Sequence, residues 1–282
     1  MKITCAVDEI RGLTADVIKT MLDKDNKGEY LLVDVRQPEE YKAGHIPGAT
    51  LIPLGELETR QGELDRSKKI ITYCRSGHRS MAAAIALCGL GFEGVQNLDG
   101  GIHNWPYETV TGIPERRPDL IAEAADVKDI LVLAMKLEKG SRSFYLAAID
   151  KARPSQLKDT FQMLAGAEYG HMQRLYERSI GLLGEEALLP LDRLEQELKV
   201  EHMEGGIEVS SALARIDDSF TDQMEALEIA VEREYMSYDF YKRTSALVEN
   251  AEAKVLLHEL AVEERRHAGK LLERLEEFVR QR

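Results

Sequence analysis

Cysteine is scarce in this sequence of 282 residues. There are three, Cys5, Cys74 and Cys88, and no two of them form a Cys-x-x-Cys pair. That spacing excludes an iron or zinc site built from four closely paired thiolates. Long apolar runs are also missing: no stretch approaches the roughly 20 residues that a membrane helix needs. The N-terminal stretch MKITCAVDEIRG lacks the apolar core of a signal peptide. We therefore expect a cytoplasmic protein with no membrane partner.

Positive charge is in deficit as well. The sequence has 37 Lys and Arg against 50 Asp and Glu, a formal net charge of −13. Binding to nucleic acid needs a basic face that can neutralise phosphates, so a nucleic-acid partner is excluded. The acidic side chains are left with two uses: they form solvated helix faces, or they bind cations.

The hydrophobic pattern changes near residue 112. Before it, strand-like runs alternate with helix-like runs such as SMAAAIALCGLGF. This alternation predicts an α/β domain over 1–112, with a parallel sheet and flanking helices. The segment 113–125 contains two prolines and several charges and is predicted to be a linker. The predicted strands are at 30–36, 49–54 and 69–74, and the segment 94–101 leads from a fourth strand into a turn.

The pattern after the linker is helical throughout. Over 126–282 it predicts four long helices, with Asn250 as a cap of the fourth. A long connection at about 181–220 separates the second helix from the third. This arrangement is typical of a four-helix bundle with one crossover.

The helical half contains an internal repeat with an offset of 96 residues. In each copy a glutamate stands six positions before a Phe-Tyr pair, and a Glu-x-x-His pair follows. Residues at i and i+3 share one face of a helix, so each such pair can direct an oxygen and a nitrogen inward. Four carboxylates are costly to bury alone, but two divalent cations would neutralise them. The six predicted metal ligands are Glu138, Glu168 and His171 in the first copy, and Glu234, Glu264 and His267 in the second.

From about residue 125 to 280 the sequence resembles the rubrerythrin branch of the ferritin-like superfamily. The resemblance implies two iron ions, with manganese or zinc as alternatives. It also implies that Tyr145 and Tyr241 orient the ligand carboxylates. Because these bundles commonly pair, a homodimer is expected.

The sequence departs from peroxide-reducing rubrerythrins in two ways. It has no Cys-x-x-Cys module for electron relay, and Ser237 stands where those enzymes carry a further glutamate. The second departure argues against peroxidase activity of that type. The first predicts that electrons for a redox-active centre come from an external donor.

The stretch CRSGHRS, residues 74–80, joins a predicted strand to a predicted helix. Backbone N–H groups in such a turn can converge on one point, and the helix N-terminus adds a partial positive charge. Arg75 and Arg79 add more. The Cys74 thiol is therefore expected to have a lowered pKa and to be largely thiolate at neutral pH. The same cradle would hold an additional anionic sulfur.

This loop resembles the active-site loop of rhodanese-type sulfurtransferases. The segments DVRQPEEYKAGHIPGA and LDGGIHNW match further parts of that module, over about residues 5–112. The resemblance implies that Cys74 takes sulfur from a small thiosulfate- or polysulfide-class donor. The resulting persulfide would be stabilised by Arg79 and the loop amides, and a thiol or other nucleophile would then accept the sulfur.

The loop length bears on the substrate. Related phosphatases have one residue more between cysteine and arginine, so the six residues from Cys74 to Arg79 favour sulfur over phosphate. Arg75 and His78 are expected to bind the donor or to tune the thiolate. The other residues expected to form the substrate-binding loop are Ser76, Gly77 and Ser80.

Three hypotheses describe the joined halves. In the first, Cys74 collects sulfur and the dinuclear centre acts as an oxidoreductase on oxygen, peroxide or sulfur species. In the second, the helical half binds or buffers iron, and the first half is an independent sulfur carrier. In the third, the metal only holds the four helices together.

Overall fold

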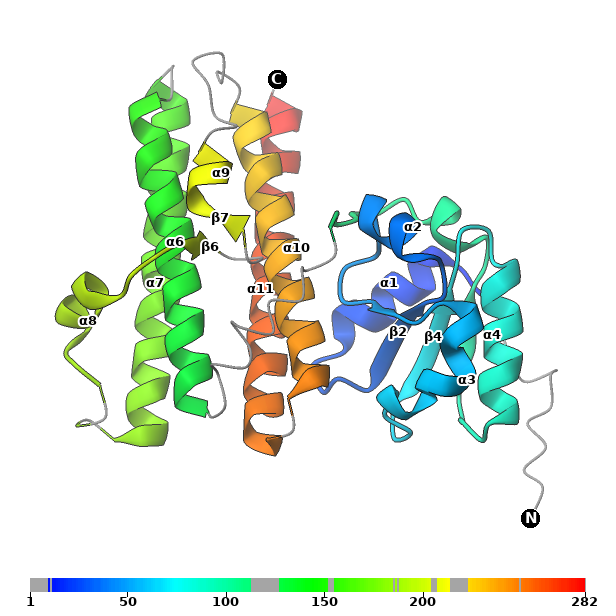
Figure 1. The fold of residues 1–282 in the computed structure, drawn as a ribbon. Helices are drawn as coiled ribbons and strands as arrows, with labels where there is room; N and C mark the ends of the chain where they lie inside the picture. Colours follow the sequence, from blue (N-terminus) through cyan, green and yellow to red (C-terminus); the bar gives the residue numbers. More distant parts are fainter. Residues whose placement is uncertain are drawn as a thin grey trace. The chain divides into compact units, whose positions relative to one another are not determined.

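The computed structural model describes residues 10, 12–112, 127–151, 155–184, 186, 188–203, 207–213, 223–248 and 250–281. The chain divides into two compact units, Met1–Glu115 and Arg116–Arg282, and each is described by itself (Figure 1). The predicted linker at 113–125 lies outside the described residues, so the proposed domain boundaries stay predictions. None of the described helices combines the length and the apolar character needed to cross a membrane.

The first unit is built on a sheet of five parallel strands in the order β1-β5-β4-β2-β3. Strands of this kind are buried on both faces, which explains the continuous apolar runs in the sequence. All four predicted strands are present, each shorter than the run that predicted it. The strands are β1 Gly12–Leu13, β2 Tyr30–Asp34, β3 Thr50–Leu51, β4 Lys69–Tyr73 and β5 Gln96–Leu98.

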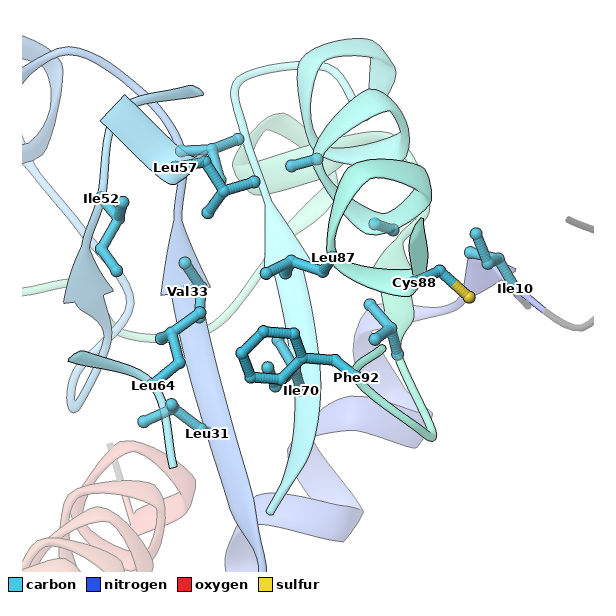
Figure 2. Close-up of a cluster of buried hydrophobic side chains, with 14 of the residues drawn as sticks. Ile10, Leu31, Val33, Ile52, Leu57, Leu64, Ile70, Leu87, Cys88 and Phe92 are labelled. Atoms are coloured by element: carbon cyan, nitrogen blue, oxygen red, sulfur yellow. The ribbon is translucent and has the colours of Figure 1, made fainter. Parts of the chain in front are cut away.

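Helices cover both faces of this sheet, which confirms the predicted α/β fold. On one face, Leu87 of α4 points toward Val33 and Ile70 of the sheet, and Cys88 lies beside Ile10 (Figure 2). On the other face, α1 packs through Ile18 and its neighbours. The helical segments are α1 Ala15–Lys24, α2 Pro38–Ala43, η2 Leu54–Glu56, α3 Leu57–Arg60, η3 Gln61–Glu63, α4 His78–Gly89 and η4 Gly101–Asn104.

The second unit is a bundle of four long helices, as predicted. Helix α6 packs against α7, and α10 packs against α11 (Figure 1). Asn250 caps α11, because its side-chain oxygen accepts a hydrogen bond from the Ala253 backbone N–H at 3.0 Å. The four helices are α6 Val127–Lys151, α7 Ser155–Leu183, α10 Gln223–Leu247 and α11 Ala251–Gln281.

The crossover contains an antiparallel hairpin that the sequence did not predict. Its first strand runs so close to α6 that a Cβ at Gly140 would lie 2.2 Å from the His202 carbonyl oxygen. Lys139 donates hydrogen bonds to the carbonyls of Glu195 and Leu198. The crossover is therefore fixed to the part of α6 that follows Glu138. Its elements are α8 Leu191–Glu197, β6 His202–Met203, β7 Ile207–Glu208 and α9 Val209–Leu213.

Candidate sulfur-transfer loop and metal centre

Cys74 lies directly after β4, at the carboxyl end of a central strand of the sheet. The chain then turns through Gly77, whose φ of +91° places it in the left-handed region, and α4 begins at His78. Glycine is suited to this position because a side chain would strain it. The turn folds back over the sulfur, and Cys74 is only 1% exposed.

Hydrogen-bond donors surround the Cys74 sulfur. The Gly77 backbone N–H donates to Sγ at 3.1 Å, and the Ser80 hydroxyl lies 3.5 Å from it. Burial by itself raises the pKa of the Cys74 thiol. Hydrogen bonds from the Ser80 hydroxyl and from the backbone of Ser80, Ser76 and Gly77 outweigh that effect, so the pKa is lowered. The geometry thus agrees with the expectation of a reactive thiolate held in a cradle.

Three other loop residues face solvent. Arg75, Ser76 and His78 are exposed, and the Ser76 hydroxyl lies 3.2 Å from Nδ1 of His78. Their predicted part in binding the donor stays a prediction.

Arg79 has a partner that the sequence did not predict. Its two terminal nitrogens, Nη1 and Nη2, each lie 2.8 Å from a carboxylate oxygen of Glu40 on α2. The pKa of Arg79 is raised, first by the hydrogen bond to Glu40 and to a smaller extent by the Cys74 sulfur. Arg79 is thus bound chiefly to Glu40, while its predicted role toward a persulfide stays a prediction.

One local signal for Glu40 exists in the sequence. Gln37 and Glu40 form a capping box with Pro38 at the first helical position, a pattern that marks the start of α2. This pattern predicts the helix. It does not predict the pairing with a residue 39 positions away.

The turn that contains Gly101 packs against the backbone of the Cys74 loop. The Ile102 N–H donates to the Cys74 carbonyl at 2.8 Å, and the His103 N–H donates to the Arg75 carbonyl at 3.1 Å. Gly101 has a φ of +62°, and a Cβ there would lie 2.3 Å from the Cys74 carbonyl oxygen. The backbone of this turn therefore fixes the backbone of the loop.

Gly101→Ala is expected to lower the kcat/KM of sulfur transfer on the order of 100-fold. The new methyl group cannot fit against the Cys74 carbonyl, so the loop must move, and displacements of about 1 Å at a reacting group have effects of this size. Steady-state sulfur transfer to cyanide measures the loss.

Gly112→Ala is the matched control for this variant. Gly112 also has a positive φ, +91°, but a Cβ there would meet nothing within 4 Å. We expect it to lose about 1–2 kcal/mol of stability through backbone strain alone and to keep its sulfur-transfer rate. Equal loss of activity in both variants would show that strain, not contact with the loop, is responsible.

The first copy of the helical repeat forms a compact ligand group. Nδ1 of His171 lies 3.2 Å from a Glu138 oxygen and 3.2 Å from a Glu168 oxygen. Glu138 comes from α6 and the other two from α7, and all three are buried. One ligand atom from each lies within 4.8 Å of the others.

The second copy is similar but looser, and its Glu234 is in neither group of candidate ligands found among the described residues. Nδ1 of His267 lies 3.6 Å from a Glu234 oxygen and 3.5 Å from a Glu264 oxygen. Glu234 comes from α10 and the other two from α11. His267 and Glu264 also form a ligand group with His171, so His171 belongs to both groups.

Further contacts repeat with the same offset. The ring pairs Phe144–Tyr145 and Phe240–Tyr241 have centroid distances of 5.3 and 5.5 Å, both at an interplanar angle of 65°. Ser237, three positions after Glu234, is completely buried. Tyr145 and Tyr241 are each 1% exposed. Their predicted role in orienting the carboxylates stays a prediction.

Buried polar atoms indicate that this cluster of carboxylates and imidazoles fits metal ions. Among the described residues, Glu168 Oε2, Glu264 Oε2 and His267 Nδ1 are buried and make no hydrogen bond, although each lies within 3.6 Å of an oppositely charged or imidazole group of the cluster. The rings of His171 and His267 stack at 3.8 Å. Buried carboxylates and imidazoles in this state are normally compensated by a cation. Oxygen and imidazole donors suit iron, manganese and zinc.

Together the two units define a class of protein: an α/β domain with a cradled thiol, joined to a helical bundle with a buried carboxylate–imidazole cluster. Comparison with known families agrees with both parts. The rhodanese-like domain family matches residues 14–107. The rubrerythrin family matches residues 129–275, just over half of the chain. The chain therefore belongs to the rubrerythrin family and carries a rhodanese-like domain before the rubrerythrin region, as the two resemblances predicted.

The similarity to individual relatives covers about a third of this chain. YrkF of Bacillus subtilis (strain 168) is 39% identical over 100 residues, which are 36% of this chain and 53% of YrkF. A sulfurtransferase of Allochromatium vinosum is 40% identical over 91 residues, 32% of this chain and 82% of that protein. The crystal structure of a rhodanese-related protein from Thermoplasma volcanium is 32% identical, covers 36% of this chain and 97% of its own, and has a TM-score of 0.32. The chain thus spans about half the length of YrkF.

Proposed function

We propose that the first unit is a sulfurtransferase whose nucleophile is Cys74, and that the second unit is an iron-dependent oxidoreductase. The donor would be a small sulfane-sulfur compound of the thiosulfate or polysulfide class. The observation that supports the first part is the buried Cys74 sulfur, which accepts a hydrogen bond from the Gly77 backbone N–H at 3.1 Å. A homodimer and an external electron donor are part of the proposal.

Sulfur transfer follows from the cradle in two steps. The Cys74 thiolate attacks the outer sulfur of the donor. With thiosulfate, the donor S–S bond breaks, sulfite leaves with the electron pair, and Cys74 becomes a persulfide. The Gly77 N–H and the Ser80 hydroxyl hold the negative charge in both forms. An acceptor thiolate then attacks the outer sulfur, and Cys74 leaves as the thiolate, ready for the next donor.

In the bundle, two iron ions would be held by the six residues of the repeat. Bound iron supplies one-electron redox chemistry, with oxygen, peroxide or a sulfur species as the proposed oxidant or substrate. The side chains of the cluster already lie where they could bind the ions. Glu168 and Glu264 keep buried oxygens directed at the cluster, and His171 contributes to both ligand groups.

Mass spectrometry of the intact protein tests the sulfurtransferase proposal. After incubation with thiosulfate and removal of excess donor, the protein is expected to gain the mass of one sulfur atom, located by peptide mapping to Cys74. Cyanide should remove that sulfur as thiocyanate. Absence of the added sulfur with thiosulfate and with polysulfide would refute the proposal.

Ser80→Ala is expected to raise the pKa of Cys74. The Ser80 hydroxyl lies 3.5 Å from the sulfur, and a hydrogen bond to the thiolate favours the charged form. Less thiolate is then present at neutral pH, so the alkylation rate of Cys74 should fall several-fold there. The rate should recover when the pH exceeds the raised pKa. The pH profile of alkylation by iodoacetamide measures both effects.

Ser76→Ala is the control for this profile. It removes a hydroxyl from the same loop, but that hydroxyl contacts His78. Its alkylation profile should match that of the wild type. If both variants shift the profile equally, the Ser80 contact is not the source of the lowered pKa.

A further inference from the structure

Arg79 of the sulfur-transfer loop is paired with a carboxylate from another helix. Glu40 binds Arg79 through both of its oxygens: Oε2 lies 2.8 Å from Nη1 and Oε1 lies 2.8 Å from Nη2. This two-point geometry is the one that arginine uses to bind phosphate, sulfate and carboxylate groups. The edge of Arg79 between Nη1 and Nη2 is therefore already occupied by the protein, while Arg79 also interacts with the Cys74 sulfur.

Glu40 is fixed in this position by its own helix. As the third residue of α2, it accepts a hydrogen bond from the Gln37 backbone N–H at 3.2 Å. The hydrogen bond from Arg79 is the largest effect on Glu40 and lowers its pKa to about 2. The carboxylate therefore stays negative over the whole physiological pH range, and the pair persists wherever the Cys74 thiolate reacts.

The Glu40–Arg79 pair affects the binding of ligands with one and with two negative charges in different ways. A dianion with oxygen atoms would need two-point contacts from Arg79 and would meet the charge of Glu40 beside them, which is unfavourable. A sulfur atom with one negative charge needs fewer hydrogen-bond donors than such a dianion. The Gly77 N–H and the Ser80 hydroxyl already lie 3.1 and 3.5 Å from the Cys74 sulfur.

We propose that Glu40 determines the specificity of the loop by occupying Arg79, so that donors with one negative charge are preferred over dianionic donors. The preferred class would be thiosulfonates and singly charged persulfides, with thiosulfate a poorer donor. This inference rests on the proposed function of Cys74. Glu40 acts through Arg79 and is therefore a positioning residue.

Two donors of nearly equal shape separate the charges. Methanethiosulfonate and thiosulfate differ by a methyl group in place of one charged oxygen, and both deliver the same sulfane sulfur. We expect the wild-type kcat/KM to be at least about tenfold higher for methanethiosulfonate. In Glu40→Gln, which frees part of Arg79, this preference should fall about tenfold, and sulfate should inhibit more strongly.

Glu39→Gln is the matched control. Glu39 is the neighbouring residue on α2, is exposed, and loses the same charge when substituted. It should keep the wild-type preference and the wild-type sulfate inhibition. The double variant with Glu40→Gln and Arg79→Gln should lose the stronger sulfate inhibition, because the freed guanidinium is then missing.

The outcomes distinguish this inference from the proposed function. If Cys74 accepts sulfur from both donors but the preference is the same in the wild type and Glu40→Gln, the role of Glu40 is refuted and the sulfurtransferase stands. An equal change of donor preference in Glu39→Gln would also overturn the role of Glu40. The loss of any negative charge on α2, without contact to Arg79, would then explain the effect. If no donor places sulfur on Cys74 in any variant, the proposed function itself fails.

Discussion

Cys74→Ser is expected to abolish sulfur transfer, with a loss on the order of 10³-fold or more in kcat/KM. Cys74 is the free cysteine in the described part of the chain, and its sulfur accepts a hydrogen bond from the loop backbone. Serine has nearly the same shape and can accept the same hydrogen bonds, so the fold should be unchanged. A serine hydroxyl cannot form a persulfide. The assay is thiosulfate- or methanethiosulfonate-dependent formation of thiocyanate from cyanide.

The same variant tests whether the two units work together. If the bundle oxidises or reduces the sulfur that Cys74 collects, adding a donor should change the rate of redox turnover at the metal centre in the wild type. Cys74→Ser should remove that change. Iron content serves as the control, because the substitution should leave it unaltered. Turnover that is indifferent to both the donor and the variant would support an independent sulfur carrier beside an iron-binding domain.

His171→Ala is expected to lower the iron content from about two ions per chain to less than one. Its imidazole lies 3.2 Å from oxygens of both Glu138 and Glu168, stacks on His267, and belongs to both ligand groups. Removing it takes a nitrogen from each group and leaves buried carboxylates that repel one another. Inductively coupled plasma analysis of the purified protein gives the metal content directly.

His258→Ala is the control for the loss of iron. His258 lies on α11, is partly buried and is not in either ligand group found among the described residues. The same substitution there should leave the iron content near the wild-type value. His171→Ala should also keep the sulfur-transfer activity of the first unit. If both histidine variants lose iron equally, general destabilisation of the bundle is the cause.

The repeat in the helical half is what allowed a set of candidate metal ligands to be predicted from the sequence. Helix periodicity is local, so Glu168 and His171 three positions apart must share a face, and the offset of 96 transfers that conclusion to the second copy. The structure brings Glu138 to the first pair and Glu234 to the second, as that pattern predicts. Such a prediction needs only the helices and their order.

Other features depend on tertiary contacts and could not be predicted in this way. Glu40 and Arg79 come from different helices, and nothing in either helix specifies the other. The hairpin in the crossover was missed for the same reason. One signal was present: Gly140 lies inside a long helix, where glycine costs about 1 kcal/mol relative to alanine. At Gly140 the missing side chain makes room for β6, but Gly166 and Gly269 also lie inside long helices with nothing within 4 Å, so the glycine alone does not predict the contact.

Metal analysis of anaerobically purified protein tests most directly whether the sulfur-transfer domain is joined to a dinuclear iron centre. The protein should contain about two iron ions per chain, and its absorption spectrum should change when oxygen or peroxide is added. Zinc in place of iron, or less than one metal ion per chain with no spectral change, would contradict the claim. The bundle would then be a scaffold for the sulfurtransferase.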